Sequence, residues 1–498
     1  MALTERDALS GVQVRLHRST LVVDDAYRAF LALREALGPD EVYLLESLAG
    51  PTADRRAALI GFGPLLDVTV VDQVILVTGV PVLVARARER LLASGTVTER
   101  GEELLLVVRE DLWQAVRAVA QTFVVEPGHP SRYSFGFLAF FGYDVASYVE
   151  VLPRRIQSVD GTPDVILRVY AGTAVFDLRE GTAELILGQS DEWEPHDPIY
   201  IAKVLSQNPA RSSREVPNVP TPLSVIDSTD QSQFSADVQK CLDHIGVGDI
   251  YQVQIGHEFS VRSEVDVLDV YARLRARNPS PYMCLLPLPG VSVVGASPEL
   301  FIRIDGREIV MRPIAGTAPR SGDEVEDERR TQALAINEKE RAEHVMLVDL
   351  CRNDLGRIAR AKTVAVDEMM VIENFSHVFH LVSNIRAELR DGLDVYDAVA
   401  ATFPAGTMTG APKIRAMEII EDTESLRRGY YAGAFGLIDF GGYVNLGLAI
   451  RTAFQRGQTW TTRASAGVVA DSEPTSEWRE TLAKMSATYW AITGQELL

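Results

Sequence analysis

Two pairs of glutamates are the residues of this chain best suited to chemistry. Glu340 and Glu343 lie three positions apart, and Glu477 and Glu480 repeat this spacing near the carboxyl terminus. On a helix, the spacing puts both carboxylates of a pair on one face. Either pair alone is more typical of a solvated helix face, but two pairs brought together would create a strong negative field that needs a cation.

The chemistry of these side chains indicates which cation. Carboxylate oxygens and retained water molecules are the ligands that Mg²⁺ prefers, and Mg²⁺ bound in this way usually also holds an anionic substrate. The pattern therefore indicates a metal-assisted enzyme acting on a small anionic molecule. For such a site to form, two helices must converge, and the apolar periodicity predicts them over residues 326–349 and 477–492.

Composition limits the alternatives. The chain has 498 residues, 46% hydrophobic and 24% charged, as in ordinary folded proteins. Its net charge of −20 disfavours nucleic acid as a partner, because phosphate binding needs a basic surface. Three cysteines in unrelated contexts predict neither disulfides nor a metal site. Since no apolar run could span a membrane or serve as a targeting segment, we expect a cytoplasmic protein without membrane contact.

Strands grouped in hairpins, with helices between the groups, predict an α+β fold with mostly antiparallel sheets. Residues 134–144 are typical of a strand buried on both faces, and residues 164–178 with 182–187 of a hairpin. Residues 189–231 are rich in Pro, Asn, Ser and Asp, which predicts a linker or a surface excursion. This divides the chain into an amino-terminal region, 1–188, and a second region, 232–498.

Four motifs of the second region stand out together. They are R-P-I-A-G-T at 312–317, E-R-A-E-H-V-M-L-V-D-L-C-R-N-D-L-G-R at 340–357, F-P-A-G-T-M-T-G-A-P-K-I-R-A-M-E-I-I at 403–420 and A-G-V-V-A-D-S-E-P-T-S-E-W-R-E-T at 466–481. As a set they closely resemble the chorismate-utilising enzymes, in particular the anthranilate synthase large subunit. The resemblance is dense from Gln252 onward, but in the first half it is limited to L-L-E-S at 44–47 and F-F-G-Y-D at 140–144.

The resemblance implies an architecture and a substrate. The fold would be a sandwich of large, mostly antiparallel sheets with helices packed outside, in which residues 1–188 are regulatory or structural and residues 232–498 bind chorismate. Chorismate carries two carboxylates, a hydroxyl that is eliminated and an enolpyruvyl ether. By the resemblance, a Mg²⁺ ion binds the ring carboxylate and acts as a Lewis acid. Its shell would be Glu340, Glu343, Glu477 and Glu480.

Further residues take roles by the same resemblance. Arg451 and Tyr431 are similar to residues that grip the enolpyruvyl carboxylate, a task that suits a guanidinium. Backbone N–H groups at Ala466 and Gly467 would assist, because glycine lets the main chain approach a ligand. Thr407 and Thr317 resemble pocket-wall hydroxyls, although either is also typical of a simple turn.

Three residues are implied in catalysis. Glu299, in G-A-S-P-E, resembles the general acid that protonates the leaving hydroxyl, and burial would keep such a carboxyl neutral. His380 resembles the histidine beside the ring that is linked to pyruvate elimination, whereas its residue context alone is equally typical of a core histidine. Lys484, one helical turn after Glu480, is placed to offset the carboxylate cluster.

Two positions separate members of the family. Members that add water have a lysine base where this chain has Gln252, and an amide cannot activate water, so ammonia is the expected nucleophile. One type of aminodeoxychorismate synthase has lysine where this chain has Ala315, which favours amination at C2 here. No cysteine lies in a glutaminase-like G-x-C-x-G segment, so a separate glutamine amidotransferase subunit is implied. The sequence also allows a homo-oligomer.

Feedback inhibition by tryptophan is a further implication. L-L-E-S with Ser47, and N-P-S-P-Y-M, resemble the tryptophan site of the family, although both are also typical of a strand end and a proline turn. The corresponding residues would be Ser47, Asn278, Pro281, Tyr282 and Met283.

The expected function is that of anthranilate synthase component I: amination of chorismate at C2, then elimination of pyruvate. Two departures from the family pattern, Ser465 in place of a glycine and Asn445 in place of an acid, support an alternative from specialised metabolism. That alternative is a 2-amino-2-deoxyisochorismate synthase that stops at the aminated intermediate. A third hypothesis, from another class, is a non-catalytic subunit that binds chorismate or tryptophan, but such a protein would not need four metal-binding glutamates.

Overall fold

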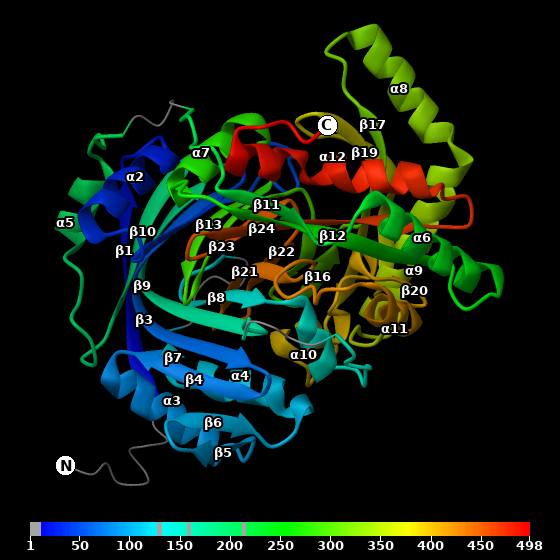
Figure 1. Ribbon diagram of the computed structural model, residues 1–498. Coiled ribbons are helices and arrows are strands. Elements are labelled where there is room, and N and C mark those ends of the chain that lie inside the picture. The colour runs from blue at the N-terminus through cyan, green and yellow to red at the C-terminus, as the bar shows by residue number, and fades with distance from the viewer. Residues whose placement is uncertain (1–10, 127–131, 157–160, 212–215) are drawn as a thin grey trace.

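A computed structural model describes residues 11–126, 132–156, 161–211 and 216–498. Within these residues the chain forms one 24-stranded, mostly antiparallel sheet system with helices around it (Figure 1). The helices are α2 (Ala26–Leu37), α3 (Pro81–Ala93), α4 (Leu112–Ala120), α5 (Pro198–Leu205), α6 (Gln231–Gly246), α7 (Val267–Arg277), α8 (Glu324–Ile336), α9 (Glu338–Gly356), α10 (Val395–Thr402), α11 (Lys413–Thr423) and α12 (Pro474–Thr493).

The strands run through both halves of the chain. They are β1 (Val12–Leu21), β2 (Val42–Glu46), β3 (Ala57–Val71), β4 (Val74–Gly79), β5 (Val97–Arg100), β6 (Glu103–Leu106), β7 (Phe123–Val125), β8 (Gly136–Phe141), β9 (Val165–Asp177), β10 (Thr182–Gln189), β11 (Ser224–Asp227), β12 (Gln252–Arg262), β13 (Tyr282–Leu288), β14 (Val291–Ser297), β15 (Leu300–Asp305), β16 (Glu308–Met311), β17 (Ile314–Pro319), β18 (Ala365–Asn374), β19 (Val378–Glu388), β20 (Gly410–Ala411), β21 (Ala434–Asp439), β22 (Val444–Leu448), β23 (Thr452–Arg456) and β24 (Thr459–Val468).

The predicted α+β sandwich is confirmed, because the apolar side chains form one core between the sheets and separate cores beneath the helices. The central core is made by residues of strands and their connections, among them Tyr43, Phe140 and Leu286. Further cores lie where helices cover the sheets: one under α2, α7 and α12, one under α3, α4, α9 and α10, and one under α6 and α11. Helices therefore pack outside a layered sheet, and Figure 1 shows α12 crossing above β12 and β24.

The two halves of the chain share their sheets. β2 of the first half pairs with β13 of the second, and β8 pairs with β21, so that Phe140 is opposite Phe435. Residues 189–231, where we predicted a linker or surface excursion, contain helix α5 and strand β11, and β11 pairs with β12. The predicted hairpin of residues 164–178 and 182–187 is the β9–β10 pair.

One predicted helix was wrong in its extent. The periodicity predicted a continuous helix over residues 326–349, but α8 ends at Ile336 and α9 begins at Glu338. Asn337 separates them with extended backbone, and its side chain accepts a hydrogen bond from the N–H of Glu340. This is the role that asparagine plays at helix starts. As a result α8 projects from the body in Figure 1, and Glu340 lies in the first turn of α9.

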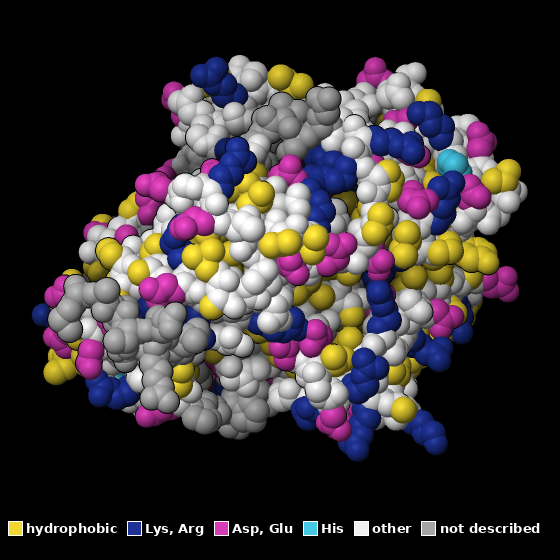
Figure 2. Space-filling model, turned by 90° about the horizontal axis from the view of Figure 1, so that it is seen from below, with side chains coloured by type: hydrophobic (Ala, Val, Ile, Leu, Met, Phe, Trp, Pro, Cys, Tyr) yellow, Lys and Arg dark blue, Asp and Glu magenta, His cyan; other side chains and the backbone are white. Residues whose placement is uncertain are grey.

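Strand β12 separates the helical layer from the interior. Val253, Ile255 and His257 point toward α6, α11 and α12, whereas Gln252 and Gln254 point the other way because side chains alternate along a strand. On the outer surface, Figure 2 shows acidic and basic side chains interspersed over one face. No helix among the described residues is long and apolar enough to cross a membrane.

Candidate active site

The two glutamate pairs are brought to one region by α9 and α12. Burial raises the pKa of Glu343 to about 7, and the neighbouring charges of Glu340 and Glu480 add to this effect. Burial and Glu480 also raise the pKa values of Glu340 and Glu477, and the positive charge of Lys339 opposes both shifts. Since Glu480 acts on carboxylates of the other helix, the two pairs face each other and repel one another electrostatically.

These carboxylates are bonded to protein groups. Glu480 forms an ion pair with Lys484 at 2.6 Å, and Lys484 also donates to the carbonyl oxygen of Ser465 at 2.9 Å. Glu343 accepts a hydrogen bond of 2.8 Å from Nε2 of Gln252. Among the described residues, no three His, Cys, Asp or Glu side chains are placed to hold a metal ion together.

The donor chemistry nevertheless fits a hard divalent cation. All four side chains offer oxygen, the ligand atom that Mg²⁺ prefers. The pKa values of three of them are raised first by burial and then by repulsion between the carboxylates, and a cation would offset that repulsion. The Mg²⁺ site therefore stays a prediction. Its four glutamates lie in one region, but in the described structure they are not arranged as a metal-binding cluster.

Arg451 lies beside this cluster and lacks a partner. Within the described part of the chain, its guanidinium makes no hydrogen bond or ion pair, although the charges of Tyr431 and Glu480 act on it. Burial lowers the pKa of this guanidinium. The Arg451 backbone is left-handed, with φ of 51°, as is that of Ala432 with φ of 61°. Such strain in non-glycine residues is typical of functional sites, and a half-buried, unpaired guanidinium is suited to bind a carboxylate.

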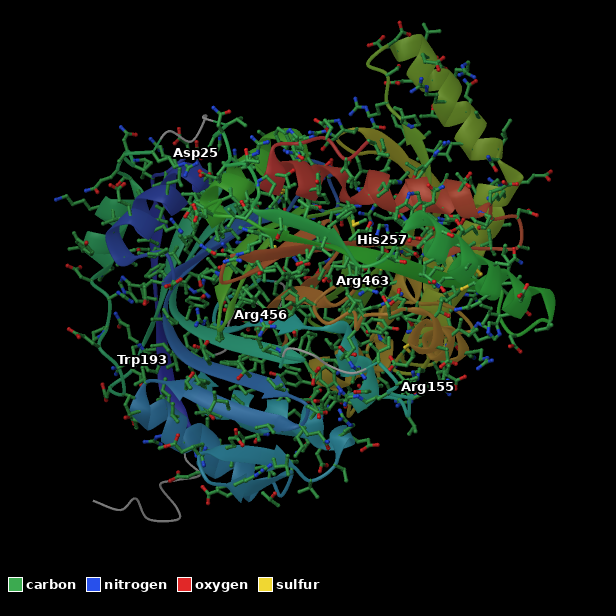
Figure 3. The ribbon with its side chains drawn as sticks, in the orientation of Figure 1. Asp25, Arg155, Trp193, His257, Arg456 and Arg463 are labelled. Atoms are coloured by element: carbon green, nitrogen blue, oxygen red, sulfur yellow. The ribbon has the colours of Figure 1, made fainter. Side chains whose placement is uncertain are left out.

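The Tyr431 ring lies next to a buried network of ion pairs. Its ring lies 6.0 Å from the guanidinium of Arg428 and 5.9 Å from that of Arg463, which Figure 3 places in the centre of the sheet. Both arginines bond to Glu424, at 3.0 and 2.7 Å. Burial acts to raise the pKa of Glu424, but the two arginines outweigh it and lower that pKa.

The predicted backbone contact at Gly467 stays a prediction, made at a closely packed position of the sheet. Ala466 and Gly467 lie in β24 opposite Ile255 and Gln254 of β12. A Cβ atom at Gly467 would lie 2.8 Å from Nε2 of Gln252 and 2.9 Å from Nε2 of Gln254. Glycine avoids this contact without moving either glutamine side chain, and its main chain is left open to the site. At Ser465, the side-chain hydroxyl is buried without a hydrogen-bond partner among the described residues.

Glu299 is a carboxyl held neutral at physiological pH. It is 7% exposed, and burial raises its pKa to about 8, although nearby Thr407, the backbone N–H of Ile314 and the charge of Lys484 each act to lower it. The hydroxyl of Thr407 is itself buried and, among the residues that the structure describes, makes no hydrogen bond of regular geometry. A protonated carboxyl can donate a proton at pH 7, as a general acid must.

His380 is neutral in the same region. Its Nδ1 donates to the carbonyl oxygen of Gly316 at 3.0 Å and lies 3.2 Å from the hydroxyl of Thr317. Burial, together with the charges of Arg451 and Lys484, lowers its pKa to about 4, although the hydrogen bond to Gly316 acts to raise it. With Nδ1 protonated, Nε2 is left as a proton acceptor. Ala315 lies on the adjacent strand β17, opposite Leu381.

Two residues next to the glutamate cluster were not predicted from the sequence. The side chain of Lys339 acts on three of the glutamates, and Ser472 donates a hydrogen bond to Glu477. Lys339 stands directly before Glu340, so its position in E-K-E was a usable signal. Ser472 lies in the turn before α12, and no spacing rule pointed to it.

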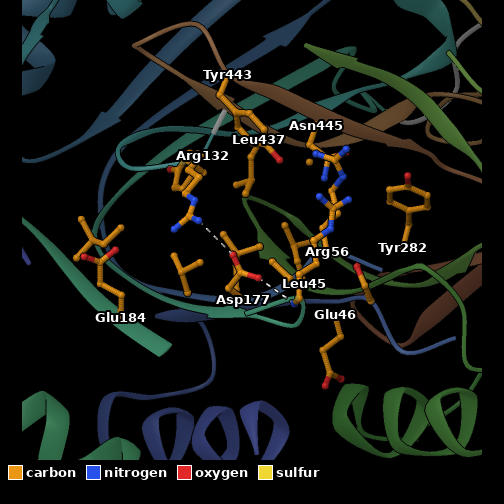
Figure 4. Close-up of a pocket in the computed structure, with 18 of the residues that line it drawn as sticks. Leu45, Glu46, Arg56, Arg132, Asp177, Glu184, Tyr282, Leu437, Tyr443 and Asn445 are labelled. Carbon is orange, nitrogen blue, oxygen red and sulfur yellow. Dashed lines mark hydrogen bonds and ion pairs between the residues drawn. The ribbon is translucent and has the colours of Figure 1, made fainter. Parts of the chain in front are cut away.

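Four of the five residues predicted for tryptophan line a separate cavity of about 880 Å³ (Figure 4). Ser47, Pro281, Tyr282 and Met283 belong to its wall, between the sheets of the amino-terminal half and those of β13 and β22. Asn278 is not part of the wall, since it ends α7 and its N–H bonds to Leu274. The tryptophan assignment stays a prediction, made at a cavity of suitable size for a small molecule.

Together, the fold and this site define a class of protein: an antiparallel α+β enzyme scaffold with a carboxylate cluster, an unpaired arginine and a protonated carboxyl facing one region. Such a set suits a small carboxylate substrate that loses a leaving group. The chain belongs to the chorismate binding enzyme family, whose model matches residues 82–489. The predicted family is thereby confirmed.

The chain is also similar to individual proteins with named activities. The chain is 51% identical to a 2-amino-4-deoxychorismate synthase of Streptomyces globisporus, over 100% of both chains. It is 37% identical to anthranilate synthase component 1 of Aquifex aeolicus, over 80% of this chain and 82% of that protein. The crystal structure of anthranilate synthase component I from Streptococcus pneumoniae matches with a TM-score of 0.71 and 30% identity, covering 87% of this chain and 92% of that one.

Proposed function

We propose that this protein aminates chorismate at C2 with ammonia and releases 2-amino-4-deoxychorismate. This compound is the 2-amino-2-deoxyisochorismate of the alternative hypothesis under another name, because both describe an amino group at C2 and loss of the C4 hydroxyl. The 51% identity over the full length of a protein with this named activity favours it over anthranilate synthase, whose examples are 35–40% identical over smaller shares of the chain or of their own length. We therefore prefer the aminated intermediate to anthranilate as the released product.

The observation that supports this chemistry is that two groups lie in one region. They are the protonated carboxyl of Glu299 and the guanidinium of Arg451, which has no ion-pair partner among the described residues. Ammonia forms a bond to C2, the two ring double bonds shift, and the C4–O bond breaks. Glu299 would give its proton to the leaving hydroxyl, so that water departs, and the new ammonium group would lose a proton. Arg451 would hold a substrate carboxylate and thereby fix the ring beside Glu299.

The glutamates of α9 and α12 would hold Mg²⁺ at the other substrate carboxylate. When bound, Mg²⁺ supplies Lewis-acid stabilisation of negative charge. The glutamates themselves orient the substrate from one side, while Gly467 leaves room for its carboxylate. A neutral His380, with Nε2 free to accept a proton, supports the second candidate function, continued elimination of pyruvate to anthranilate.

Ammonia would come from a separate glutamine amidotransferase. Cys241, Cys284 and Cys351 are buried, and burial raises the pKa of each thiol, so none is a suitable nucleophile for glutamine. Relatives named component 1 support a two-subunit enzyme.

Product identification tests the proposal. With chorismate, Mg²⁺ and ammonium chloride, we expect a non-aromatic aminated product by mass spectrometry, and with glutamine alone we expect none. Dominant blue-fluorescent anthranilate would favour the second candidate. Unchanged chorismate would support a non-catalytic binding subunit, and turnover with glutamine alone would refute the separate glutaminase.

Gln252 provides a second prediction. Its Oε1 is buried without a hydrogen-bond partner in the described structure, and an amide oxygen can accept from ammonia. We expect Gln252→Leu to raise the KM for ammonia by about fivefold, since a lost hydrogen bond costs on the order of 1 kcal/mol. The KM for chorismate should change by less than the KM for ammonia.

Gln254→Leu, two residues along the same face of β12, is the control for this prediction. It should alter the KM for ammonia less than Gln252→Leu does. Equal effects of the two variants on ammonia and chorismate would show that Gln252 has no special relation to the nucleophile.

A further inference from the structure

A series of buried, hydrogen-bonded side chains connects the sheet to α12, the helix that carries Glu477 and Glu480. Nδ1 of His257, on β12, donates to Oδ1 of Asp227 at 2.7 Å, and Nε2 is hydrogen-bonded to Oγ1 of Thr481 at 2.8 Å. His257 is 1% exposed and Thr481 is 0% exposed. Figure 3 places His257 directly beneath α12. The connection therefore joins β11, β12 and α12 within the protein interior.

The order carboxylate, imidazole, hydroxyl is that of a hydrolytic triad, but burial excludes this role. No substrate can reach a hydroxyl that is fully buried, and the Thr481 hydroxyl lies within 2.7 Å of the carbonyl oxygen of Trp478, which can take its one hydrogen. Nucleophilic catalysis requires an accessible hydroxyl. The connection must therefore serve the arrangement of the protein itself.

The position of Thr481 on α12 indicates which residues these hydrogen bonds hold in place. Thr481 follows Glu480 directly and lies four residues after Glu477, so it is held in the same helical turn as both glutamates. Trp478, between the two glutamates, stacks on the His257 ring with centroids 4.4 Å apart and planes inclined by 17°. The sheet thus holds the glutamate-bearing turn of α12 by a hydrogen bond and by a stacked ring.

We propose that His257 is a positioning residue that fixes the rotation of α12 about its axis, and through it the direction of Glu477 and Glu480. The inference rests on the proposed cation site. At a helix radius of roughly 5–6 Å, a rotation of about 10° moves a side chain by about 1 Å. Displacements of this size at a ligand set weaken metal binding strongly, and loss of supporting contacts typically costs about 10–100-fold in metal affinity.

Thr481→Val tests this most directly, because it removes the hydroxyl and keeps the volume. We expect it to weaken Mn²⁺ binding, used in place of Mg²⁺ and measured by electron paramagnetic resonance, by about tenfold or more. His257→Phe, which keeps a ring against Trp478, should have a similar effect. Combining the two should add little, because both break the same bond.

Thr488→Val is the matched control. Thr488 is also a buried threonine of α12, bonded across the interface to Thr462 of β24 at 2.7 Å, but it lies two turns beyond Glu480. It should lower the melting temperature comparably while leaving Mn²⁺ affinity within about twofold of wild type. Unchanged Mn²⁺ affinity in Thr481→Val, or an equal loss in Thr488→Val, would overturn the inference. Absence of Mn²⁺ binding to the wild-type protein would instead refute the cation site, and the inference with it.

Discussion

Glu480→Gln is expected to lower kcat/KM for chorismate by about 1000-fold or more while the protein stays folded, because several kcal/mol of Lewis-acid stabilisation would be lost. Glu480 is the neighbour common to the cluster, since its charge acts on Glu340, Glu343 and Glu477. The substitution keeps the shape of the side chain and removes the charge that a divalent cation would bind.

Initial rates with saturating ammonium and a range of Mg²⁺ concentrations measure the effect. Glu473→Gln is the control: the same substitution at an exposed residue just before α12, where the side chain makes no capping bond. It should retain nearly full activity. Because the neutral glutamine of Glu480→Gln also relieves repulsion, we expect the pKa of Glu343 to fall in that variant. Wild-type activity in Glu480→Gln would remove the argument for a metal site.

The sequence was informative wherever a function is carried by neighbouring residues. The E-x-x-E spacing predicted which helix faces would carry carboxylates, and α9 and α12 bring them to one region. Family motifs covered Arg451, Glu299 and His380, because each lies in a short local segment that resembles the family. The hairpin strands were predictable for the same reason, since turn residues and alternation are local signals.

What the sequence did not reveal depends on contacts between distant segments. The bond between His257 and Thr481 spans 224 positions, and the pairing of β11 with β12 lies in a segment whose composition indicated only a linker. The break at Asn337 was missed because asparagine is tolerated inside helices, and only the cap geometry shows that a new helix begins. The pKa values of Glu299 and His380 likewise come from burial, which no motif encodes.

Glu299→Gln is expected to lower kcat by about 10²–10⁴-fold, the usual contribution of a general acid. Its second effect distinguishes it from other inactive variants. In the folded protein the pKa of Glu299 is raised from 4.5 to about 8, so between these values the unfolded chain is ionised and the folded protein is not. Unfolding then releases a proton, and the free energy of unfolding falls as pH rises through this window.

Glutamine cannot ionise, so the variant should gain stability relative to wild type as pH rises from about 4.5 to 8. The rise of this pKa from 4.5 to about 8 sets an upper limit of about 5 kcal/mol on this gain. Urea unfolding at several pH values measures it, and Glu264→Gln, at an exposed glutamate, should show no such trend. The wild-type rate should fall above about pH 8 as Glu299 loses its proton. If Glu299→Gln instead remained active, or if its stability followed wild type at every pH, Glu299 would not be the buried acid that expels the hydroxyl.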